Sequence, residues 1–161
     1  MKLKILGITI ASVLVIASIS SVARGQWDDR YWRTYNKRQV EEIIKNVETS
    51  ADGFRKDFDT WLDHSHFDGK EKEDKFNSKV KRFEESTDRL RKEFDRRDSW
   101  WETRNEVQRV VNEGNSISQM MRNHEFGRGV EDEWRKLRTD INKLAATYRL
   151  PLISWPGRGR R

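Results

Sequence analysis

The stretch Val130–Tyr148, VEDEWRKLRTDINKLAATY, decides the fold. Its apolar residues recur in alternating steps of four and three positions: Val130, Trp134, Leu137, Ile141, Leu144 and Tyr148. This spacing is typical of an amphipathic helix with one apolar seam. Pro151 follows, and proline lacks the amide hydrogen that a continuing helix needs. A single helix of this length is only marginally stable in water, so other helices must cover its seam.

Two segments in the N-terminal half have the same apolar period, and we predict a helix in each. The first begins at Asn36, where the side chain and that of Gln39 are expected to form a capping box, and it ends near Asp63. The second follows a turn and begins with a cap made by Asp68 and Glu71. The chain is therefore expected to reverse its direction between these two helices.

A third segment before the Val130–Tyr148 helix completes the set. The period breaks near Asp98, and Ser99 with Glu102 forms the pattern of a capping box that opens another helix. The alternative is one long helix that continues through Asp98 and Ser99. The glycine-containing loop 123–129 separates this segment from the last helix.

The fold class expected from these segments is all-α. Four helices with short connections pack most simply as a four-helix antiparallel up-down-up-down bundle, here over residues 37–150. An aromatic-rich lead-in, 24–36, precedes the bundle, and an extended basic tail, 151–161, follows it and is expected to fray. Regular seams can also pair between chains, so a homodimer is an open alternative.

The N-terminus is predicted to be a signal peptide, residues 1–23, that precedes the bundle. Lys2 and Lys4 come before an almost uninterrupted apolar run, and small residues then allow cleavage after Ala23 or Gly25. An uncleaved membrane anchor is the alternative, although the run is shorter than the roughly 20 residues that span a bilayer. We therefore expect an exported protein, either periplasmic or extracellular. The chain contains no cysteine, so disulfides cannot stabilise it after export.

The charge of the mature chain argues against nucleic acid as a partner. Removing Lys2 and Lys4 with the first 23 residues leaves 31 basic side chains against 27 acids, a net charge of +4. Three of these positive charges are clustered in the tail, at Arg158, Arg160 and Arg161. The helical body is thus nearly balanced, and its high charge content is typical of exposed helix faces.

Three blocks of the C-terminal half resemble a known group of proteins. The blocks are STDRLRKEFDRR, EVQRVVNEGNSISQMM and WRKLRTDINKLAATYRL, between about Ser86 and Leu150. They are similar to uncharacterised small exported helical-bundle proteins of environmental bacteria. The resemblance implies export and a helical bundle, and it transfers no catalytic residue.

The histidines are the candidate metal ligands. The chain has three, and the predicted topology places His64, His66 and His124 at one end of the bundle. Imidazole with neighbouring carboxylates suits zinc or copper. The simpler interpretation is that they are exposed residues that complement helix C-termini.

No residues are predicted to be catalytic and no cofactor is expected. The acids lie on exposed helix faces, and no nucleophile motif or phosphate-binding glycine loop is present. The seams contain no histidine for haem or di-iron ligation. Ala51, Thr87 and Gly114 are expected to share a middle layer, which allows either close helix packing or a small ligand pocket.

The tryptophans provide the candidate interaction surface. The predicted topology gathers tyrosines and five of the seven tryptophans at the end opposite the histidines. These five tryptophans are Trp27, Trp32, Trp100, Trp101 and Trp155. Tryptophan is enriched in binding hot spots. The alternative is that these rings cap the core. The sequence thus predicts a structural or interaction protein that binds an unknown protein or envelope component, with a periplasmic small-ligand or metal-binding protein as the alternative.

Overall fold

The computed structural model describes residues 35–154, and this part of the chain is all-helical, without a strand. Its four α-helices are α2 (Lys37–Asp63), α3 (Glu71–Arg96), α4 (Arg104–Asn123) and α5 (Arg128–Thr147). A short 3-10 turn, η1 (Trp100–Thr103), precedes α4. The all-α prediction is confirmed for the described residues. None of their helices combines the length and the hydropathy needed to cross a membrane.

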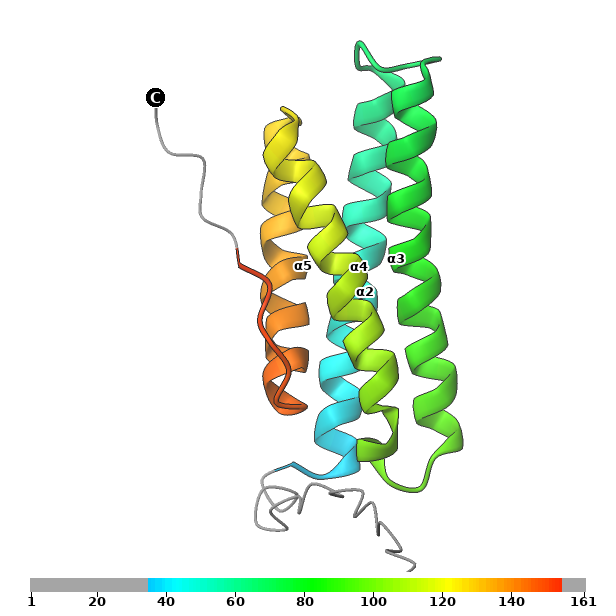
Figure 1. The fold of residues 1–161 in the computed structure, drawn as a ribbon, viewed down its shortest axis with the longest axis vertical. Helices are drawn as coiled ribbons and strands as arrows, with labels where there is room; N and C mark the ends of the chain where they lie inside the picture. Colours follow the sequence, from blue (N-terminus) through cyan, green and yellow to red (C-terminus); the bar gives the residue numbers. More distant parts are fainter. Residues whose placement is uncertain (1–34, 155–161) are drawn as a thin grey trace, which may run out of the picture.

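The helices lie side by side, with their axes along the long direction of the molecule (Figure 1). The most extensive contacts join α2 to α5 and α3 to α4, and weaker contacts join α2 to α3 and α4 to α5. All six seam residues predicted between Val130 and Tyr148 are at most 2% exposed. Leu152 is the one large apolar residue that is exposed in the described part. The seams therefore cover one another within a single chain.

The starts of α2 and α4 differ in how their first amide groups are satisfied. The predicted capping box at α2 is confirmed, because Asn36 Oδ1 accepts from Gln39 N and Gln39 Oε1 accepts from Asn36 N, both at 2.9 Å. The capping box predicted at Ser99 is wrong. Its side chain caps nothing, and the 3-10 turn η1 bridges it to α4. The helix is interrupted between Arg97 and Ser99, so the single long helix is excluded.

The cap predicted at Asp68 is also wrong. α3 begins two residues later than predicted, after Lys70, which makes no side-chain cap. Gly69 adopts φ +69°, a left-handed conformation that glycine tolerates and other residues avoid. Its amide donates to Glu73 Oε2 at 2.7 Å, so a glutamate inside the helix holds the turn.

Residues 150–154 turn back after α5 and run alongside it (Figure 1). Leu150 and Ile153 are 6% and 2% exposed, so this segment is packed and the expected fraying does not occur in it. Asn142 holds it with both ends of its amide: Nδ2 donates to Ile153 O at 3.1 Å, and Oδ1 accepts from Ile153 N at 2.7 Å. We call residues 150–154 the C-terminal strap.

Gly114 on α4 provides the seat for the strap. A Cβ atom built at this position would lie 2.5 Å from Ile153 Cδ1 and 3.3 Å from Ile141 Cδ1. A residue larger than glycine therefore collides with the strap. Gly114 was predicted to allow either close helix packing or a small pocket. The space beside it is occupied by the side chain of Ile153, from the segment after α5.

Candidate functional site

The predicted aromatic end is built around Tyr148 at the end of α5. The Tyr148 hydroxyl donates to Trp100 O at 3.0 Å and lies 2.9 Å from Thr103 Oγ1. The Trp100 ring meets the Tyr148 ring edge-on, with 5.0 Å between centroids, and it is 6% exposed. Trp100 is therefore part of the core. Its predicted place on the interaction surface is corrected, because the buried ring has little area left for a partner.

Trp101 is the neighbouring ring, and it remains half-buried. It stacks on Tyr148 with an interplanar angle of 10° and a centroid distance of 6.0 Å. The Trp100 ring meets it edge-on at 5.6 Å. One face of Trp101 thus rests on a buried ring, which fixes its orientation. The other predicted surface residues, Trp27, Trp32 and Trp155, lie outside the described residues.

The hydroxyl of Tyr148 is held in its neutral form. Burial away from water raises the pKa of Tyr148 above its ordinary value of 10.0, and the negative charge of Glu106 acts in the same direction. The hydrogen bond with Thr103 lowers the pKa but does not offset the burial. The phenol therefore serves as a neutral hydrogen-bonding group at this end.

The three histidines lie at the other end, near the turns that follow α2 and α4. His64 Nδ1 lies 2.8 Å from Thr60 O, and the His66 ring lies 3.8 Å from the Phe67 ring. The His124 ring lies 4.9 Å from that of Phe76. No group of three or more His, Cys, Asp or Glu side chains within residues 35–154 is arranged to hold a metal ion. A metal site formed by the histidines stays a prediction, and a zinc titration tests it.

The environment of His124 disfavours its charged form. Burial lowers the pKa of His124, and the nearby Lys72 lowers it further. A neutral imidazole is the form that binds metals, but it is also the form that loses least when it is moved out of water. Its ring lies against those of Phe67, Phe76 and Phe126, which supports the packing role.

The histidine end also contains an aromatic cluster that sequence reasoning missed. Phe126 lies 5.0 Å from Trp61 and 5.6 Å from Phe76, and Phe67 lies 5.2 Å from Phe76. A Cβ at Gly127 would lie 2.6 Å from Trp61 Cδ1, so this glycine lets the loop approach the ring. Phe67 and Phe126 stand in turns and follow no helical period. Their only signal was an aromatic residue inside an otherwise polar loop.

The interior of the bundle offers little space for a ligand. A hollow beside Trp134, lined also by Glu131, Arg135 and Arg138, has a volume of about 40 Å³. That is far below the roughly 300–1,000 Å³ of usual ligand pockets. A hollow of that size, about 410 Å³ beside Lys45, Asp52 and Asp88, is lined mostly by exposed polar side chains. Within residues 35–154 no Asp, Glu, Lys, Arg or His side chain is buried. The chemistry that these residues offer is therefore at the surface.

Comparison with known proteins places the chain in no family. No family model and no curated protein matches its sequence, and no solved structure matches it.

Proposed function

We propose that the protein is exported and acts by binding a protein or an envelope component at its aromatic end. The observation that carries this proposal is the fixed, half-buried ring of Trp101 on the buried Tyr148. An aromatic ring that is already held in place loses little conformational entropy on binding. Such rings are enriched in the binding hot spots of protein interfaces.

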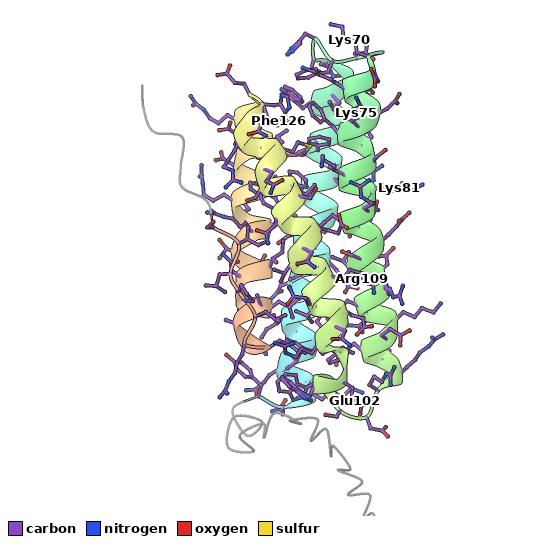
Figure 2. All side chains as sticks on the ribbon, viewed as in Figure 1. Lys70, Lys75, Lys81, Glu102, Arg109 and Phe126 are labelled. Carbon is purple, nitrogen blue, oxygen red and sulfur yellow. The ribbon has the colours of Figure 1, made fainter. Side chains whose placement is uncertain are left out.

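The proposed arrangement of the bundle is antiparallel, with alternating up and down helices. The start of α2 meets the end of α3, because Lys37 Nζ donates to Arg97 O at 2.5 Å. The end of α4 meets the start of α3 through His124 and Phe76. Figure 2 shows Phe126 and Glu102 at opposite ends of the molecule. These contacts support an antiparallel arrangement with Trp100, Trp101 and Tyr148 at one end and the histidines at the other.

Export rests on the N-terminal sequence, which lies outside the described residues. Lys2, Lys4, the apolar run and the small residues up to Ala23 support a cleaved signal peptide. Mass spectrometry of the protein from its source is expected to show an N-terminus at Arg24 or Gln26. A soluble protein that keeps Met1 contradicts export.

A binding role is proposed in place of catalysis. Among the described residues the buried polar side chains, apart from Tyr148, are serines and threonines: Ser86, Thr87, Thr103, Ser118 and Thr147. A general acid or base usually depends on a partly buried ionisable group whose pKa is shifted toward neutrality. The raised pKa of Tyr148 moves it away from neutrality.

The test is a pair of tryptophan substitutions at the two ends. Wild-type protein, Trp101→Ala and Trp61→Ala are immobilised and exposed to envelope and extracellular fractions of the source. Both rings are half-buried, and Trp61 lies in the aromatic cluster at the histidine end. We expect Trp101→Ala to lose the captured partner and Trp61→Ala to keep it.

Unfolding free energies separate this result from simple misfolding. Truncating a buried aromatic costs about 3–5 kcal/mol, and we expect Trp101→Ala to cost less. Equal capture by the two variants contradicts the proposed surface. A cost of about 3 kcal/mol or more at Trp101 assigns the ring to the core instead.

A further inference from the structure

A basic hollow lies on the side of the bundle, between α3 and α4, away from the aromatic end and from the histidine end. Its volume is about 220 Å³, several times the roughly 30 Å³ that one water occupies in the liquid. Six residues line it: Arg82, Glu85, Ser86, Arg89, Arg109 and Glu113. Figure 2 shows Arg109 on α4 at the border with α3. Three guanidinium groups from two helices thus share one hollow.

The two acids of the hollow are already engaged, but two of its arginines are not. Glu113 pairs with Arg82 at 3.6 Å. Glu85 pairs with Lys81 at 4.0 Å. Neither Arg89 nor Arg109 lies within ion-pair distance of an acid in the part of the chain that the structure describes. The six lining residues include three arginines and two glutamates, a net charge of +1, and within residues 35–154 no ion pair neutralises Arg89 or Arg109.

The frame of the hollow is held by contacts between the two helices. Lys79 Nζ donates to Ser116 Oγ at 3.0 Å, one turn beyond the Arg82–Glu113 pair. Ser86 is 4% exposed and its hydroxyl donates to Phe83 O at 2.6 Å. The oxygen of Ser86 is thereby anchored between Arg82 and Arg89, which are two helical turns apart.

We infer that this hollow binds a phosphate group. The guanidinium fork matches phosphate oxygens and forms two parallel hydrogen bonds with them, and two unpaired arginines match the double charge of a phosphate monoester. Binding here is independent of the partner proposed for the aromatic end, because no residue of the hollow belongs to that end. The phosphate can come from a soluble compound or from a lipid headgroup.

The test uses the purified protein and two probes. Inorganic phosphate is titrated while the amide and arginine Nε signals are followed by NMR. The variant Arg89→Gln/Arg109→Gln removes the two unpaired charges, and Arg38→Gln/Arg128→Gln removes two charges from α2 and α5 as a matched control. All four arginines are exposed, so both variants should fold. Thermal unfolding checks this.

We expect phosphate to shift the signals of Arg89, Arg109 and the Ser86 amide. The affinity should fall about tenfold or more in the first variant, because a charged hydrogen bond is lost, and less than about twofold in the control. An equal fall in both variants shows non-specific attraction and overturns the site. Absence of localised shifts overturns it as well.

Vesicles distinguish the source of the phosphate. Cosedimentation is measured with phosphatidylcholine vesicles with and without phosphatidic acid, whose headgroup is a phosphate monoester. Binding that needs phosphatidic acid, is lost in Arg89→Gln/Arg109→Gln and is competed by inorganic phosphate supports the site with a lipid source. Phosphate binding without vesicle binding supports it with a soluble source. If neither probe binds, or if both variants bind them equally, the inference fails.

Discussion

Replacing Gly114 with alanine tests how the C-terminal strap is seated. The new Cβ would lie 2.5 Å from Ile153 Cδ1 and 3.3 Å from Ile141 Cδ1, closer than the roughly 3.5–4.0 Å of favourable carbon contacts. Alanine stabilises a helix by about 1 kcal/mol relative to glycine. Overpacking costs about 1–3 kcal/mol. We therefore expect Gly114→Ala to lower the free energy of unfolding by up to about 2 kcal/mol.

The effect of Gly114→Ala on the free energy of unfolding should change sign when the Ile153 side chain is removed. Ile153→Ala alone is expected to cost about 2 kcal/mol, at the low end for a buried isoleucine because the strap can adjust. In that background the closest contact is gone, so Gly114→Ala should stabilise by about 0.5–1 kcal/mol through its helix propensity. The four proteins form a double-mutant cycle, measured by urea unfolding followed by circular dichroism.

The control for this cycle is Gly53→Ala on α2. A Cβ at this position would meet only Glu133 Oε2, at 3.3 Å, so its effect should be the same with and without Ile153. If Gly114→Ala has equal effects in the two backgrounds, within about 0.5 kcal/mol, Ile153 does not occupy the seat. The packing assigned to the strap is then wrong.

Two further substitutions test single hydrogen-bonding groups. Asn142→Ala removes both hydrogen bonds to the strap backbone and should lower the free energy of unfolding by about 1–3 kcal/mol, whereas Thr139→Ala, an exposed position on α5, should change it by less than about 0.5 kcal/mol. Equal effects of the two substitutions contradict the stabilising role of the Asn142 hydrogen bonds to the strap. Burial raises the pKa of Tyr148, so above about pH 10 the folded state keeps the hydroxyl proton that the unfolded state loses. The free energy of unfolding should therefore fall as the pH rises above about 10, by up to about 1.4 kcal/mol per pH unit. Tyr148→Phe should show a shallower loss between pH 10 and 11.5, and parallel curves for the two proteins contradict the raised pKa.

The candidate site was only partly predictable from the sequence. That Trp100 and Trp101 lie near Tyr148 followed from the predicted order of helices, because an alternation of up and down helices puts the start of α4 and the end of α5 at the same end. Which ring is buried did not follow, because a 3-10 turn has no apolar period to read. Contact with Tyr148 buried Trp100 and left one face of Trp101 at the surface.

The failed helix caps have a similar physical reason. Capping patterns at Asp68 and Ser99 are local, but local hydrogen bonds of about 1 kcal/mol compete with the packing of whole turns. At the α2–α3 turn, burial of Phe67 among the rings of the histidine end accompanies a left-handed Gly69 and a later helix start. The Asn36 box at α2 formed as predicted, with both of its hydrogen bonds at 2.9 Å.

The sequence by itself determined the four helices and the faces that they bury. Apolar spacing of three and four residues is a property of each segment alone, so the seam from Val130 to Tyr148 was readable without knowing its partners. Tertiary structure alone decided where Ile153 goes. Its seat combines Gly114 and Ile141 with the amide of Asn142, groups from two helices. No periodicity within residues 150–154 encodes that meeting, because the groove exists only once α4 and α5 have packed.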